Sequence, residues 1–159
     1  MAKKWEDMKL TVELVPKPLW GLSLYAKLSR AAWSALKKKV FAEEGKRCFI
    51  CGYAGQRFYL HEFWDYDDKR RVQRLVSVHH LCDFCHKVKH IGRTLHTPDG
   101  ERELEQQGLT REDIVAHFCA VNNCESSDFE RYHDEVFKVW RERNRHKWSQ
   151  DIPQEIITR

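Results

Sequence analysis

Two pairs of cysteines constrain this chain more than any other feature of its sequence. Cys48 and Cys51 form one C-x2-C motif, and Cys82 and Cys85 form a second after thirty intervening residues. Two-residue spacing lets both thiolates of a pair turn toward one point, and two pairs supply the closed tetrahedral sulfur set that structural zinc prefers. The sequence therefore predicts a zinc knuckle in which metal binding and folding are one event.

The surroundings of these cysteines favour zinc over disulfides. The amino terminus, MAKKWEDMKL, has no apolar core of signal-peptide length, and no stretch approaches a membrane span. We therefore expect a cytoplasmic protein with no membrane partner, and in a reducing compartment this cysteine spacing indicates metal. Gly52, directly after the first pair, suits a tight knuckle turn. Cys119 and Cys124 match no knuckle spacing, even with His117 and His133, and are expected to be partly buried helix residues.

The length and composition of the chain predict one α+β domain. Its 159 residues are too few for two typical domains, and an apolar fraction of 42% supplies a core. We expect a single domain over 1–159 in three parts. These are an N-terminal strand and helix (1–47), a zinc-stabilised ββα core (48–93) and a C-terminal helical part (94–159).

Local patterns predict the elements ahead of the first cysteine pair. Residues 9–15 (KLTVELV) alternate apolar and polar side chains, which predicts a short strand ended by Pro16. Apolar residues then recur at helical spacing from Ser29, which can cap the helix start, to Gly45, which can end it. This helix leads the chain into the first cysteine pair.

The segment between the cysteine pairs predicts a hairpin. Two strand-like runs, Arg57 to Trp64 and Arg74 to Leu81, are joined by a polar turn rich in Asp, Lys and Arg. A helix is expected from Asp83 to Ile91. The order is therefore knuckle, strand, strand, helix.

Helices are expected to dominate the C-terminal part. Residues 94–108 contain Pro98 and Gly100 and are expected to form an exposed connection with one helical turn near 101–106. Thr110 and Ser127 each precede an acidic residue by three positions, so each is expected to open a helix. The tail from Trp148 is expected to pack loosely.

Five of the nine histidines are expected around the predicted zinc site: His61 in the first strand, His79 and His80 in the second, and His86 and His90 on the helix. His86 and His90 are four residues apart and share one helical face, a spacing that can hold one metal ion. His61 and Glu62 are neighbours on a strand, so their side chains point to opposite faces and only one can meet that helix.

Several strings in this sequence resemble one nuclease family. They are CFICG, YLHEFWDYDD, QRLVSVHHLCDFCHKVKHIG, HFCAVN and WRERNRHKW, and together they span nearly the whole chain. The chain resembles small bacterial and phage HNH endonucleases. This resemblance implies a ββα-metal fold, one catalytic divalent ion such as Mg²⁺ and hydrolysis of DNA phosphodiester bonds.

The resemblance also implies roles for individual residues. His61 matches the strand histidine that activates water, His86 matches the helix histidine that holds the metal, and His90 would be a further ligand or a phosphate contact. The sequence departs from the family at Leu60, where Asp or His is usual, and at Ser77, where Asn is usual. Two arrangements stay open: His61 is the base beside a reduced ligand set, or His61 is a ligand and Glu62 is the base.

Cations gather around the predicted ββα segment and favour phosphate contacts. The chain carries a formal net charge of only +4, so their local distribution matters more than the total. The alternative is a solvated charged surface. The candidate nucleic-acid contacts are Lys69, Arg70, Arg71, Arg74, Lys87, Lys89 and Arg93, opposed in this span only by Asp83.

Three functions are compatible with these patterns. The first is an HNH-type, metal-dependent DNA endonuclease with structural Zn²⁺. The second is a catalytically silent HNH-like module that binds DNA or a protein partner, for example as an inhibitor. The third is a knuckle that only supports a helical interaction surface after Thr110, including a homodimer interface.

Overall fold

The computed structural model describes residues 5 to 158, which form two compact units. One, the sheet unit, comprises Val15–Cys82 and the described residues from Arg141 onward. The other, the helical unit, comprises the described residues up to Leu14 together with Asp83–Trp140. The expected mixture of helix and strand is confirmed, and the expectation of one domain stays a prediction. No helix within residues 5 to 158 is both long and apolar enough to cross a membrane.

The sheet unit is built on the predicted hairpin. Strands β1 (Tyr59–Asp67) and β2 (Val72–Leu81) pair antiparallel, with His61 opposite His79. A bulge between Phe63 and Trp64 interrupts the register. Both predicted strands are therefore confirmed, and both are longer at the turn than expected.

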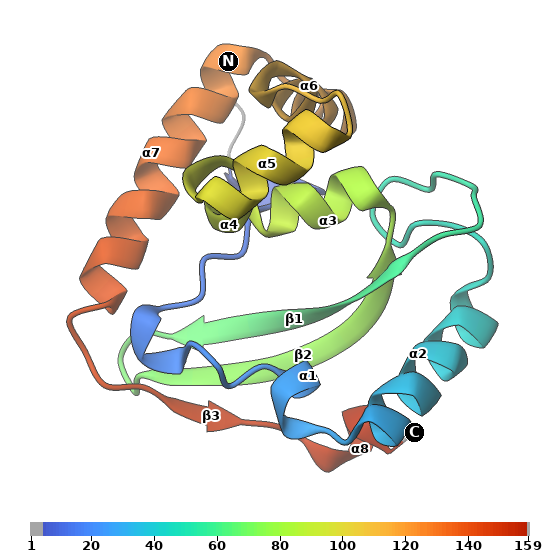
Figure 1. Cartoon of the computed structure of the whole chain (residues 1–159). Coiled ribbons are helices and arrows are strands. Elements are labelled where there is room, and N and C mark those ends of the chain that lie inside the picture. Colours follow the sequence, from blue (N-terminus) through green and yellow to red (C-terminus); the bar gives the residue numbers. More distant parts are fainter. Residues whose placement is uncertain (1–4, 159) are drawn as a thin grey trace. The chain divides into compact units, whose positions relative to one another are not determined.

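The C-terminal tail forms part of this sheet, so the prediction of loose packing is wrong. Strand β3 (Ser149–Asp151) runs parallel to β2 and gives the sheet the order β1-β2-β3 (Figure 1). The Asp151 carboxylate accepts a 2.7 Å hydrogen bond from Arg74, and the Ser149 amide donates to the Arg71 carbonyl. These partners are distant in sequence, so no local pattern indicated the third strand.

Helix α2 (Arg30–Glu44) forms as expected and packs against the hairpin. The Ser29 side chain accepts a hydrogen bond from the Ala32 amide, and Gly45 ends the helix at a φ of 73°, where glycine is favoured. The short segments of this unit are a 3₁₀ turn (Lys17–Leu19), α1 (Leu24–Lys27) and α8 (Gln154–Ile157). Its core consists of Leu24, Leu36, Val40, Leu60, Leu75 and Val78.

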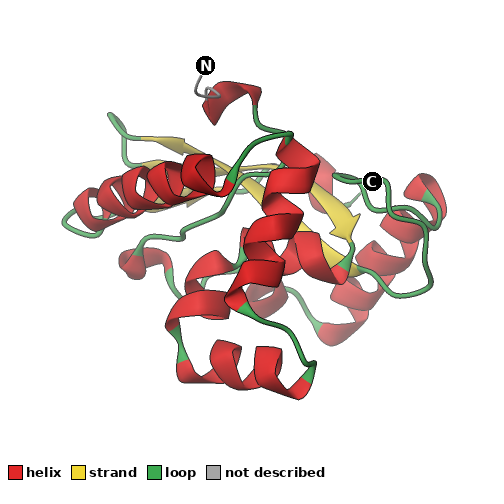
Figure 2. Ribbon diagram, turned by 90° about the horizontal axis from the view of Figure 1, so that it is seen from above, coloured by secondary structure: helices red, strands yellow, loops and turns green. Residues whose placement is uncertain are grey.

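The helical unit has no strand among its described residues, and helices, red in Figure 2, dominate it. Phe118 and Phe129 are fully buried, and Phe118 also stacks on Tyr132 with ring centroids 5.4 Å apart. The elements are a 3₁₀ turn (Trp5–Asp7), α3 (Asp83–Lys89), α4 (Ile91–His96), α5 (Pro98–Gln106), α6 (Arg111–Asn122) and α7 (Ser126–Arg143), which continues past the end of the unit.

Residues 9–15 form no strand, so that prediction is wrong. Their backbone groups bond to side chains of α6 and α7 instead. The Asn122 Oδ1 accepts from the Leu10 amide at 2.9 Å, its Nδ2 donates to the Leu10 carbonyl at 2.8 Å, and the Tyr132 hydroxyl accepts from the Val12 amide at 2.9 Å. The alternating pattern indicated an extended segment correctly, but side chains rather than a neighbouring strand satisfy its backbone.

Residues 94–108 are more helical than expected. The helix predicted from Asp83 to Ile91 divides at His90, and α4 and α5 follow it. The Thr97 side chain caps α5 by accepting from the Gly100 amide at 3.1 Å. Pro98 occupies the first turn of α5, where its missing N–H costs no hydrogen bond. It marks a helix start here rather than a loop.

The two predicted helix starts after residue 108 have different outcomes. Thr110 and Asp113 form a complete capping box at the start of α6, as expected. Ser127 lies inside α7, which begins at Ser126. The bond that resembles a cap is made two positions earlier in the chain, where the Asp128 carboxylate accepts from the Glu125 amide at 3.0 Å.

Gly100 is predicted to tolerate no side chain, although alanine normally favours a helix. A Cβ at this buried position would lie 2.0 Å from the Arg93 carbonyl oxygen and 2.7 Å from that of Thr94. Because these are backbone atoms, the Gly100→Ala change should destabilise the protein by about 1–3 kcal/mol. Denaturant unfolding measures this, with Gly92→Ala as the control, where the nearest atom is a Leu14 side-chain carbon at 3.4 Å. Equal stability of the two variants would contradict the prediction.

Candidate metal centres

The first cysteine pair lies in a tight loop between α2 and β1. Arg47 and Ala54 form an isolated antiparallel bridge at the base of the loop. Inside it, the Cys48 amide donates to the Tyr53 carbonyl and the Gly52 amide donates to the Cys48 carbonyl, each at 2.9 Å. Gly52 has a φ of 76°, which is the conformation expected of it. This loop holds the two cysteines of the pair near each other.

The four cysteines of the two motifs lie close together, as predicted. Their sulfur atoms are all within 4.8 Å of one another, and the Cys51 and Cys82 sulfurs are 3.6 Å apart. None of these four cysteines forms a disulfide bond, and only Cys51 is more than marginally exposed. Four thiolates with no other donor type suit Zn²⁺, and they leave no open position for a substrate.

His117 contacts Cys85, a contact that the sequence did not predict. The His117 Nε2 on α6 lies 3.2 Å from the Cys85 sulfur, and its ring packs on Phe84 at 5.2 Å between centroids. An N–H that donates to a ligating thiolate orients it and stabilises its charge. No spacing signal could have identified His117, because it comes from a separate helix.

Cys119, Cys124 and His133 lie outside the group of four cysteines. Cys119 lies in α6, and its pKa is raised to about 12, mainly by burial and secondly by the nearby Cys124. His133 pairs with His96, whose Nε2 lies 2.9 Å from that of His133. The pKa of His96 is lowered mainly by burial and secondly by the nearby His133. The expectation of partly buried helix cysteines is confirmed for Cys119, and Cys124 lies just after α6.

Three predicted site histidines form a second potential metal-binding group. His61, His86 and His90 each offer a ring nitrogen within 4.8 Å of the others. The rings of His86 and His90 are 4.6 Å apart. His61 is 4% exposed, whereas His90 is exposed, so the group includes a residue in contact with solvent. Imidazoles suit Zn²⁺, Fe²⁺ or Ni²⁺ better than Mg²⁺, which prefers oxygen ligands.

Glu62 lies on the opposite face of β1 from His61 and has structural partners. Its Oε1 accepts from the Leu24 amide at 2.8 Å, at the start of α1, and its Oε2 accepts from the Trp64 indole at 3.1 Å. Leu60 shares this face and lies in the core of the sheet unit. The catalytic role expected of Glu62 stays a prediction, and the carboxylate is absent from the histidine group.

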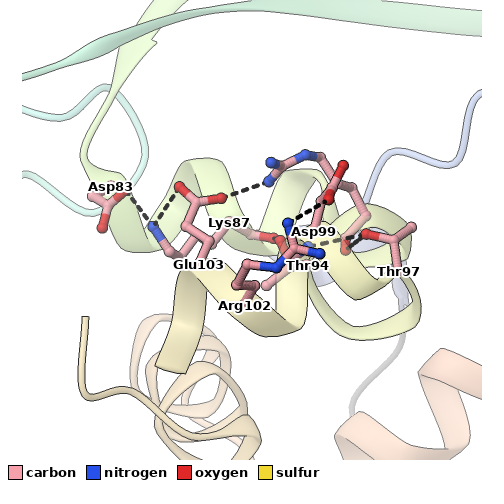
Figure 3. A network of polar contacts seen from close by, with 9 residues as sticks. Asp83, Lys87, Thr94, Thr97, Asp99, Arg102 and Glu103 are labelled. Atoms are coloured by element: carbon pink, nitrogen blue, oxygen red, sulfur yellow. Dashed lines mark hydrogen bonds and ion pairs between the residues drawn. The ribbon is translucent and has the colours of Figure 1, made fainter. Parts of the chain in front are cut away.

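Two of the predicted phosphate contacts on α3 and α4, Lys87 and Arg93, pair with carboxylates of the helical unit, and Figure 3 shows Lys87 between Asp83 and Glu103. Lys87 is 6% exposed and lies 2.6 Å from Asp83, and Arg93 lies 2.6 Å from Glu103. Lys89 is 5% exposed and donates to the Thr11 hydroxyl. Burial lowers the pKa of its ammonium group, although nearby Glu13 and Cys85 oppose this effect.

The predicted phosphate contacts on the hairpin differ in their accessibility. Arg74 is paired with Asp151 at 2.7 Å, and the Arg71 guanidinium lies 6.0 Å from the Trp148 ring centroid. Lys69 and Arg70 are exposed at the turn, where their amides donate to the Asp67 carboxylate. Phosphate binding by this set stays a prediction. Of these two side chains Lys69 is the more available, because the Arg70 guanidinium lies 3.9 Å from the Asp67 carboxylate.

Comparisons with family models, with curated proteins and with solved structures gave no match for this chain. The cysteine and histidine groups therefore provide the chemistry from which a function can be proposed.

Proposed function

We propose that this protein is a metal-dependent nuclease that hydrolyses DNA phosphodiester bonds at the group formed by His61, His86 and His90. The observation that carries this proposal is the approach of the three ring nitrogens within 4.8 Å of one another. Three imidazole rings whose nitrogens converge on one point are typical of a metal-binding site. The resemblance to HNH endonucleases supplies the reaction class.

The chain's residues would divide the chemistry between them. A divalent ion held by His86 and His90 would neutralise charge on a phosphate and favour attack by water. His61 is buried and positioned by β1, so its imidazole is suited either to complete the ligand set or to take the proton from water. The cysteine group would hold Zn²⁺ for structure alone, because its four thiolates leave no open position.

The structural zinc would also position the reactive group. Cys82 follows β2 directly, and Cys85 lies in the first turn of α3, immediately before His86. A metal bound by both cysteines fixes the path of the chain between them. The histidine next to Cys85 is then held by a short, constrained segment rather than by a free helix end.

A plasmid-cleavage assay on zinc-loaded protein tests the proposal, with Mn²⁺, Ni²⁺, Mg²⁺ or a weak chelator in separate reactions. We expect metal-dependent nicking that falls by about 10²- to 10⁴-fold in His61→Ala and His86→Ala. The control is His146→Ala, which removes a histidine that lies just after α7 and contacts Glu142. Cleavage by His86→Ala at the wild-type rate would overturn the assignment.

Metal analysis separates the two roles of His61. If His61 is a ligand, His61→Ala should lose the second ion and retain the cysteine-bound zinc. If His61 is the base, the variant should retain both ions and lose only turnover. The two arrangements thus predict different metal contents for His61→Ala, which inductively coupled plasma mass spectrometry measures.

The alternative is a catalytically silent binding module. Its motivation is that Leu60 lies in the core and Glu62 binds the start of α1, so β1 supplies no carboxylate to the histidine group. Saturable DNA binding by well-folded, metal-loaded protein without any cleavage would favour this alternative over the nuclease.

A further inference from the structure

The cysteine loop exposes two aromatic side chains to solvent. Phe49, inside the first C-x2-C motif, is 51% exposed, and Tyr53, just after it, is 60% exposed. Large aromatic residues are normally buried, and two on one short loop are a feature that packing does not explain. We call these residues, together with Lys46, Arg47 and Arg57, the knuckle surface.

The knuckle surface is also cationic. Residues 45–57 contain Lys46, Arg47 and Arg57 and no Asp or Glu. All three side chains are exposed, and none forms an ion pair with a carboxylate of residues 5 to 158. This distinguishes them from Lys87, Arg74 and Arg93, whose charges are matched by nearby carboxylates.

Phe49 is held in a fixed orientation on β2. Its ring stacks on His79 with centroids 3.4 Å apart and planes parallel within 1°, and its amide donates to the His80 carbonyl at 3.1 Å. His79 is in turn held by the Glu44 carboxylate at 3.1 Å. One face of the Phe49 ring is therefore occupied, while half of the side chain stays accessible.

Tyr53 is positioned by Gly55, which lies two residues further along the chain. A Cβ at Gly55 would lie 2.6 Å from the Tyr53 Cε1, so the ring lies directly over the bare glycine backbone. The Tyr53 carbonyl is fixed by the Cys48 amide, which ties the ring to the cysteine loop. Both aromatics are therefore presented by a loop with little freedom, which lowers the entropy cost of binding.

We propose that the knuckle surface binds single-stranded DNA, with bases stacked on Phe49 and Tyr53 and phosphates at Lys46, Arg47 and Arg57. Aromatic rings stack on unpaired bases of any sequence, and adjacent cations follow the backbone. Bases in a duplex are already stacked, so paired DNA lacks the faces that these rings would contact. The identity of the polymer rests on the proposed nuclease function, and the preference for unpaired strands goes beyond it.

Fluorescence anisotropy tests this with a labelled 20-mer of deoxythymidine and a duplex of equal length. The protein carries its zinc, and no other divalent ion is added, so binding is measured without cleavage. We expect Tyr53→Ala to weaken single-strand binding by about 5- to 150-fold, whereas Tyr53→Phe retains it because the ring remains. Arg47→Gln should reduce the dependence of log Kd on log salt by about 0.7.

Tyr25→Ala is the matched control, because Tyr25 is 69% exposed but packs on Trp33 outside the cysteine loop. Zinc content and circular dichroism confirm that each variant is folded. Unchanged single-strand binding by Tyr53→Ala, or equal binding of duplex and single strand, would overturn the proposal. Single-strand binding that depends on Tyr53, in a protein that cleaves no DNA, would support the binding surface and contradict the nuclease function. The failure of one proposal can therefore be told from the failure of the other.

Discussion

The Cys51→Ser variant is expected to lose metal binding at the cysteine group and with it the fold of the cysteine loop. Its sulfur lies 3.6 Å from that of Cys82, within a group of four thiols. Zinc contributes on the order of 10–16 kcal/mol to the folding of isolated knuckles, comparable with the whole stability of a typical domain of about 5–15 kcal/mol. Even a fraction of this loss would unfold the segment that joins β2 to α3.

The measurement is zinc content per chain together with thermal unfolding, each with and without a strong chelator. Wild type treated with the chelator should match Cys51→Ser, and the variant should not respond further. Cys119→Ser is the control, since Cys119 lies in α6 outside the cysteine group. A Cys51→Ser protein with a full zinc equivalent and an unchanged Tm would show that this group does not hold the metal.

Asn122→Ala is expected to produce the second large loss of stability. The Asn122 side chain is 1% exposed and satisfies the Leu10 amide, the Leu10 carbonyl and the Lys9 amide, all within 2.9 Å. Alanine would remove the partner of all three backbone groups; the two of Leu10 are buried, and each buried unpaired group costs about 1–3 kcal/mol. We expect a total destabilisation of about 3 kcal/mol or more.

Urea unfolding measures this loss, and hydrogen exchange locates it. Exchange at the amides of Lys9 and Leu10 should become fast in Asn122→Ala, because the residues lose their acceptor. Asn123→Gly is the control one position away, since Asn123 is exposed and adopts a φ of 51° that glycine accommodates easily. A change below about 0.5 kcal/mol in Asn122→Ala would contradict the account of residues 9–15, since surface substitutions have effects of that size.

Local sequence determined the elements whose signals lie within a few residues of one another. The cap at Ser29, the glycine end at Gly45 and the capping box at Thr110 each require only neighbouring atoms, and all three form as expected. The hairpin between the cysteine pairs also followed from alternation and a polar turn. The cysteine spacing likewise predicted the approach of the four sulfurs, because two-residue spacing already aligns each pair.

Tertiary structure decided which polar groups serve the fold and which remain available. The sequence shows a run of cations, but Arg74 pairs with Asp151, 77 residues away along the chain, and Arg93 pairs with Glu103 on the next helix. Glu62 is equally conspicuous in sequence, and only the fold places one of its oxygens at the Leu24 amide and the other at the Trp64 indole. Secondary-structure propensity, helix caps and ligand spacing depend on residues close together in the chain, so they can be predicted from the sequence. Ion pairs and the hydrogen-bond partners of backbone groups depend on segments that folding brings together.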